Sequence, residues 1–259
     1  MKNKFLVTLA LPLAIALLPV TSYSETSGFE TNGNVTVTPS DKTDPLDPEN
    51  PLEPVDPGEG PSTDGELRID FVSTINFADA KITKNNRVYP SLAQLFHSDT
   101  PARASYIQIT DLRKDNPGWN LQLKQEIQFK NIDNIELSGA RLSFDKGWAS
   151  SGGIGKSPIL FRDAISIDEI GSSYEIATAP KGAGQGTWLL SFGSSSDNKV
   201  GQEVTLNELK DEDGKTMVDP IFKKNMYSNS AVSLAIPEKT TIVPGRYQTE
   251  LTWILQATP

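Results

Sequence analysis

Apolar and polar side chains alternate along most of the chain from residue 66 onward. Leu67, Ile69 and Phe71, for example, are separated by Arg68 and Asp70. A period of two with one apolar face is typical of a half-buried antiparallel strand. The same kind of pattern predicts strands at residues 67–71, 106–110, 119–127, 135–144, 164–167, 174–177, 187–192, 231–236 and 246–256.

Turn-forming residues separate these predicted strands, with clusters at residues 115–118, 150–153 and 211–214. Helical signal is thin and is confined to residues 91–96 and 206–210, where a turn or two is expected. A strand–helix–strand rhythm is absent. We therefore expect residues 65–259 to form an all-β domain, either an antiparallel sandwich or a Greek-key barrel.

The first 24 residues have the order of a secretory signal peptide. Lys2 and Lys4 precede an apolar run from Phe5 to Leu18, and Pro19 and small polar residues follow. Cleavage is expected near Ser24 or two residues earlier. A permanent membrane anchor is the less favoured alternative, because this run is shorter than the roughly 20 apolar residues that span a bilayer. We expect export, and no membrane span in the mature chain.

Residues 25–64 have a different composition from the rest. They carry ten acidic side chains and only Lys42 as a base, and few large apolar side chains. Prolines recur at every third position, which matches the three-residue turn of polyproline II. These prolines are Pro45, Pro48, Pro51, Pro54 and Pro57. The pattern predicts a disordered, extended spacer of about 40 Å, with recognition by a partner or cation binding as the alternative.

Composition excludes several classes of function. The chain has no cysteine, one histidine (His97) and a net charge of −9, most of it in residues 25–64. Disulfides, cysteine nucleophiles and thiolate or two-histidine metal sites are therefore excluded, and no cofactor is expected. Acidic chains are poor ligands for nucleic acid. We expect His97 to be a loop residue rather than a catalytic base.

Three other patterns fall short of a catalytic or ion-binding motif. Residues 152–157 end like a phosphate loop, but Ser150 stands where that motif requires glycine. Residues 211–214 begin like a calcium loop that lacks its later ligands. A glycosidase requires only two suitably spaced carboxylates, so a glycan hydrolase stays open as a third hypothesis. We expect a protein that is not an enzyme.

Two Trp-x-Leu tripeptides stand out, at Trp119–Leu121 and Trp253–Leu255. Residues two apart share a face of a strand, so Tyr247 and Leu251 are expected on the same face as Trp253. Two interpretations stay open for these side chains. They are either anchors of the core, or part of a platform on which a sugar ring stacks.

These motifs resemble the WxL-domain surface proteins of Gram-positive bacteria over residues 65–259. The resemblance includes a Gly-Trp-Asn-Leu sequence at residues 118–121 and a Gly-rich segment that leads to Trp188. It also includes the terminal pattern of the family, formed here by Tyr247, Leu251, Thr252, Trp253, Leu255 and Pro259.

The resemblance implies a secreted protein that is held non-covalently on the cell wall and binds peptidoglycan or an associated wall glycan. It also implies membership of multi-protein surface complexes, so a structural subunit that binds another surface protein is the alternative. The sequence stops at Pro259 without a sorting motif. We accordingly expect retention by the folded domain or a partner rather than by a covalent anchor.

Overall fold

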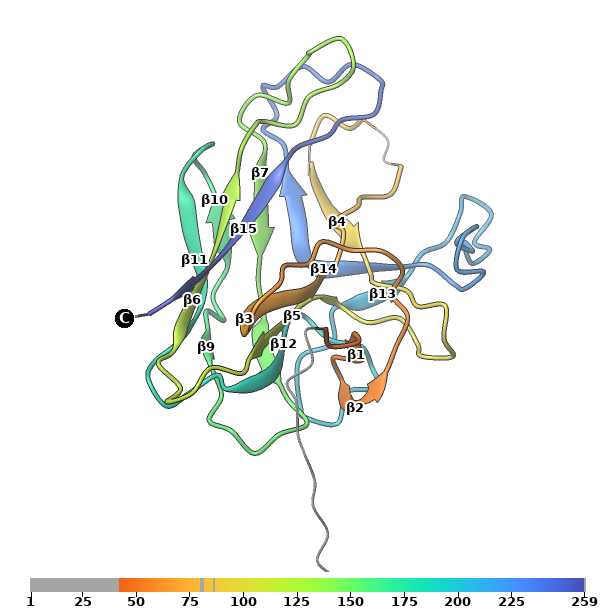
Figure 1. The fold of residues 1–259 in the computed structure, drawn as a ribbon. Helices are drawn as coiled ribbons and strands as arrows, with labels where there is room; N and C mark the ends of the chain where they lie inside the picture. Colours follow the sequence, from red (N-terminus) through yellow and green to blue (C-terminus); the bar gives the residue numbers. More distant parts are fainter. Residues whose placement is uncertain (1–41, 80–81, 86, 259) are drawn as a thin grey trace, which may run out of the picture. The chain divides into compact units, whose positions relative to one another are not determined.

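A computed structural model describes residues 42–79, 82–85 and 87–258. The predicted signal peptide and the first part of the predicted spacer lie outside these residues. Within the described part, all named elements are β-strands and all strand pairs are antiparallel (Figure 1). The prediction of an all-β antiparallel fold is confirmed.

The first large sheet, here the β5 sheet, has the order β3-β5-β12-β8. Its strands are β3 (Leu67–Val72), β5 (Ser105–Asp111), β12 (Gly186–Phe192) and β8 (Gly147–Ser150). Every residue of β5 is buried, which means that both faces of this sheet are covered.

The second sheet, here the motif sheet, has the order β15-β6-β11-β9. Its strands are β15 (Leu251–Ala257), β6 (Trp119–Gln125), β11 (Ser173–Ala179) and β9 (Ile159–Leu160). Trp253 lies opposite Leu123 and Leu255 opposite Leu121. The two Trp-x-Leu tripeptides therefore lie on neighbouring strands, with β15 at the edge of the sheet (Figure 1).

The third sheet is centred on β14 (Tyr227–Ala235), which pairs with three other strands. They are β7 (Arg141–Phe144), β13 (Leu206–Glu208) and β4 (Val88–Leu92), and β10 (Ile165–Ile167) extends the sheet beyond β7. The helical turns predicted at residues 91–96 and 206–210 are wrong. Both stretches contribute strand residues that pair with β14, and this long-range pairing overrides a weak local preference.

The three sheets share one hydrophobic core. Ile107 and Ile109 contribute to it from β5, Leu121 and Leu123 from β6, and Phe144 from β7. Successive side chains of a strand point to opposite faces, so each strand contributes to this core at every second position.

The acidic, proline-rich segment is folded onto this domain instead of extending away from it. Residues 46–54 form a hairpin of β1 (Leu46–Asp47) and β2 (Asn50–Pro54), and Val55 is buried. The predicted extended spacer is therefore wrong for this stretch. Pro51 and Pro54 are tolerated because β2 is an edge strand, where a missing N–H leaves no ladder hydrogen bond broken. We call residues 42–57 the docked hairpin.

Charged side chains attach the docked hairpin to the domain. The Arg103 guanidinium donates to both carboxylate oxygens of Asp47, at 2.8 and 2.9 Å, and lies 3.3 Å from Glu49. Glu49 in turn accepts hydrogen bonds from the Ser195 amide and hydroxyl, each at 2.6 Å. Burial lowers the pKa of Arg103, but its hydrogen bond to Asp47 and the charges of Asp47 and Glu49 outweigh the effect of burial, so the pKa is raised.

The docked hairpin also covers apolar side chains on the outer face of the β5 sheet. Val55 joins a buried cluster with Phe71, Phe96, Tyr106 and Leu189. The hairpin contributes few apolar side chains to this second core, because the sheet and the loop that carries Phe96 supply most of it.

Candidate functional site

Trp119 of the first motif lies in the core. Its side chain is fully buried and its indole N–H donates to the carbonyl of Gly184 at 3.1 Å. Leu121 is buried on the same face of β6. Of the two interpretations that its sequence left open, Trp119 therefore fits the first: it is an anchor of the core and not part of an exposed platform.

Gly184 is the position that lets a loop close over the Trp119 indole. Its φ is +74°, and a Cβ built there would lie 2.5 Å from Ala179 Cβ and 2.6 Å from the Trp119 Nε1. The Gly-rich segment before β12 and the first Trp-x-Leu motif thus pack against each other. The sequence identified both segments but contained no sign of this contact.

We expect Gly184→Ala to lower the free energy of unfolding by about 2–4 kcal/mol, because it adds backbone strain to a clash with the buried indole. Gly182→Ala is the matched control: its φ is +84°, but nothing lies within 4 Å of its added Cβ. That variant should lose only about 1 kcal/mol, from backbone strain alone. Urea unfolding followed by circular dichroism measures both, and equal losses would contradict the packing role of Gly184.

Trp188 is also a core residue, 5% exposed, and its indole N–H donates to the Gln185 carbonyl at 2.9 Å. Trp148, which the sequence analysis did not single out, is buried in β8 and donates to the Gly193 carbonyl at 2.7 Å. A tryptophan without a flanking repeat or motif carries no sequence signal that separates it from ordinary core residues.

Trp253 differs from the other three tryptophans. It is half-buried on the edge strand β15 and packs edge-on against Phe144, with ring centroids 6.1 Å apart. Its indole N–H has no hydrogen-bond partner among the described residues, whereas the other three indoles each donate to a backbone carbonyl. Leu251 and Leu255 are half-buried beside it and pack against the same core. Trp253 therefore keeps part of its ring and its one donor accessible.

Tyr247 is separate from this group. The predicted strand at residues 246–256 begins only at Leu251, and Tyr247 packs instead beside a small cluster that includes Phe129 and Leu137. Its hydroxyl donates to the Val243 carbonyl at 2.8 Å and so closes the preceding loop. The prediction that Tyr247 shares the strand of Trp253 is wrong, because the pairing with β6 is irregular before residue 251.

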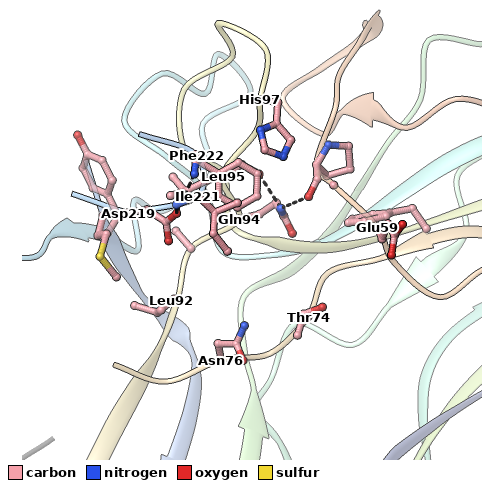
Figure 2. Close-up of a pocket in the computed structure, with 16 residues that line it drawn as sticks. Glu59, Thr74, Asn76, Leu92, Gln94, Leu95, His97, Asp219, Ile221 and Phe222 are labelled. Atoms are coloured by element: carbon pink, nitrogen blue, oxygen red, sulfur yellow. Dashed lines mark hydrogen bonds between the residues drawn. The ribbon is translucent and has the colours of Figure 1, made fainter. Parts of the chain in front are cut away.

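A pocket of about 330 Å³ opens beside the docked hairpin (Figure 2). Four stretches of the chain form its walls, namely residues 57–59, 71–76, 92–97 and 219–227. The second of these stretches begins in the last two residues of β3. His97 lies in this pocket as an exposed loop residue, as predicted, and the His97 amide donates to the Asp56 carbonyl at 2.7 Å. No local sequence pattern marks this pocket, because its walls are far apart in the chain.

Two further properties concern the described part of the chain. It contains no group of three or more histidine or carboxylate side chains placed to hold a metal ion. No helix in it is long and apolar enough to cross a membrane.

Together these features define a class of protein: a three-sheet β domain in which two Trp-x-Leu strands pair side by side around one core. The chain belongs to the WxL domain surface cell wall-binding family, whose family model matches residues 24–259. The match includes the segment that forms the docked hairpin. The family places the protein at the cell surface, in association with the cell wall. No curated protein and no solved structure matches the chain.

Proposed function

We propose that this protein is exported, is held non-covalently on the wall of a Gram-positive bacterium by direct contact between its β domain and peptidoglycan, and catalyses no reaction there. Membership of a surface cell wall-binding family supports the location. The choice of peptidoglycan as the wall component and the absence of catalysis are the proposed parts.

The observation that carries direct contact is the state of Trp253. A tryptophan combines a large apolar face with one hydrogen-bond donor, and buried indoles normally use that donor inside the protein. Trp253 uses neither its whole face nor its donor, and it lies on an edge strand beside the half-buried Leu251 and Leu255. Such a ring is suited to stacking on a sugar ring of the wall.

We expect Trp253→Ala to weaken retention on peptidoglycan sacculi at least about tenfold while the protein stays folded. Purified protein is incubated with sacculi and pelleted, and the fraction left in the supernatant is measured. Ile132→Ala is the matched control, because Ile132 is an apolar side chain that is 95% exposed elsewhere on the domain. A folded Trp253→Ala protein that pellets like the wild type would overturn direct contact through this residue.

A structural subunit that binds another surface protein is the second candidate, and one observation favours it. Five large apolar side chains between residues 200 and 221 are exposed, namely Val200, Val204, Met217, Val218 and Ile221. Large apolar side chains that are exposed can mark a protein interface, and this stretch of the chain carries several of them. Sacculi stripped of other proteins distinguish the candidates: a subunit of this kind would fail to pellet with them until its partner is added back.

A glycan hydrolase is the third candidate, because Glu59 and Asp219 both line the pocket. Long incubation of the protein with sacculi should release no soluble sugars or muropeptides if the protein only binds. Release of such fragments, and its loss in Glu59→Gln or Asp219→Asn, would replace the proposed function with hydrolysis.

A further inference from the structure

The pocket beside the docked hairpin has one wall of aromatic side chains. The rings of His97 and Phe222 lie 4.5 Å apart at an interplanar angle of 35°, and both border the pocket. Tyr227 adds further aromatic surface, and the largely buried Phe71 borders the pocket. Aromatic rings supply rigid apolar faces, and the C–H face of a sugar ring is a natural partner for such a surface.

Polar side chains line the pocket as well, among apolar ones such as Leu92, Leu95 and Ile221, and some of the polar ones have no partner within the described part of the chain. Glu59, Thr74 and Asn76 make no side-chain hydrogen bond there, and they line the same pocket as Asp219. One carboxylate oxygen of Asp219 accepts from the amides of Ile221 and Phe222, at 2.8 and 2.9 Å, which leaves the other oxygen available. Figure 2 shows Glu59 and Asp219 on opposite sides of the pocket, with Thr74 and Asn76 below His97.

The amide of Gln94 has a fixed orientation in this pocket. Its nitrogen donates to the carbonyls of Pro57 and Leu95, at 3.2 and 2.7 Å, and its oxygen is left without a donor among the described residues. Pro57 belongs to the docked hairpin, so the hairpin both builds a wall and holds Gln94 in place. The carboxylates of Glu59 and Asp219 and the amide oxygen of Gln94 are acceptors that a ligand rich in donors can use.

The charged side chains of the pocket limit which classes of ligand it can bind. None of its sixteen lining residues, all within the described part, is lysine or arginine. The neighbouring Lys224 donates to the carbonyls of Ser98 and Thr100, and burial lowers its pKa. Phosphate groups are usually recognised by arginine, lysine or exposed backbone amides, so the pocket is unsuited to a phosphate-rich wall polymer.

We propose that this pocket binds one or two rings of a glycan that carries no negative charge, with the sugar face on the His97–Phe222 pair and its hydroxyl or amide donors on Glu59, Asp219 and Gln94. The volume of about 330 Å³ lies at the lower end of the range for small-molecule sites. The choice of a glycan among donor-rich ligands rests on the proposed wall function. A lysine-rich peptide could pair with Glu59 and Asp219, but it has no ring to stack on the His97–Phe222 pair.

The single histidine provides a direct test with the wild-type protein. Because the chain has one histidine, its carbon-bound imidazole protons give isolated proton NMR signals that report on this pocket. The probes are the tetrasaccharide of β-1,4-linked N-acetylglucosamine, maltotetraose, inorganic phosphate and tetralysine. We expect saturable shifts of the His97 signals with at least one tetrasaccharide, with a Kd of about 0.1–1 mM, and none with phosphate. No shift with either sugar at about 5 mM, or tighter binding of tetralysine, would overturn the proposal.

Two variants and a control locate the binding. Phe222→Ala should weaken sugar binding at least about tenfold. Glu59→Gln, which keeps the size and shape of the side chain and removes its charge, should weaken sugar binding severalfold. Phe161→Ala, which removes a 44% exposed phenylalanine outside the pocket, should leave it unchanged. Glu59 is exposed, so its variant tests the proposal even if Phe222→Ala perturbs the loop. Unchanged sugar affinity in both pocket variants would overturn the proposal.

The same proteins separate this inference from the proposed function. If sugars bind at His97 but the wild-type protein does not pellet with sacculi, wall attachment is overturned and glycan binding in the pocket is supported. If the protein pellets normally but sugars do not shift the His97 signals, glycan binding in the pocket is overturned and wall attachment through Trp253 is unaffected.

Discussion

Replacing Trp119 with alanine is expected to lower the free energy of unfolding by about 3–5 kcal/mol. The variant removes a fully buried ring, leaves a cavity between β6 and the Gly184 loop, and deprives the Gly184 carbonyl of its donor. Urea unfolding followed by far-ultraviolet circular dichroism measures the loss without depending on tryptophan fluorescence.

Trp253→Ala is the matched control for this experiment. The same atoms are removed from the equivalent position of the second motif, but from a half-buried ring, so a loss of only about 1–2 kcal/mol is expected. Similar losses for the two variants would contradict the distinction between a core tryptophan and an accessible one, and with it the basis of the proposed function.

Arg103→Met is expected to have the second large effect, a loss of about 3–5 kcal/mol in the free energy of unfolding. Asp47 and Glu49 have side chains only 6% and 3% exposed, and Arg103 is the cation that pairs with both. Removing it takes the cation away from two buried carboxylates. Undocking of the hairpin relieves this cost, so limited proteolysis should cut residues 42–57 in the variant and spare them in the wild type.

Two controls accompany Arg103→Met. Arg141→Met breaks an ion pair with Asp168 in which both side chains are more than half exposed, and it should change stability by no more than about 0.5 kcal/mol. Adding Asp47→Asn and Glu49→Gln to Arg103→Met should restore part of the loss, because the buried charges are removed with their partner. A single Arg103→Met variant as stable as the wild type would show that the ion pairs do not hold the hairpin.

The strands around the main core were predictable because each places every second side chain against that core. Alternation in β3, β5, β6 and β12 follows directly from the need to place every second side chain against the core, and the predicted positions agree with the observed strands to within a few residues. Tyr247 shows the limit of this argument: a period of two continues past the point where the strand loses its partner.

The docked hairpin was not predictable from composition. Its few apolar side chains and regular prolines favour an extended, solvated chain, and nothing local indicates that Asp47 and Glu49 are buried. Their partner Arg103 lies 56 residues beyond Asp47, and Ser195 lies 146 residues beyond Glu49. A charged side chain looks the same in a sequence whether it meets water or a buried counter-ion.

The pocket was hidden for a related reason. His97 was expected in a loop, and it is in one, but Phe222, Gln94 and Glu59 become its neighbours only when the hairpin and the loop before β14 come together. The tryptophans, by contrast, were found by their motif, yet only the hydrogen bonds and burial separate Trp119 and Trp188 from Trp253.

The position of β15 also determines when the domain can finish folding. In the pairing of β6 with β15, Trp119 lies opposite Ala257. The strand that carries the first motif therefore pairs with a strand more than a hundred residues further along the chain. Contacts of such long sequence separation form slowly, because the intervening chain must lose entropy first. A chain that is synthesised from its N-terminal end therefore keeps β6 without this partner until β15 has also been made.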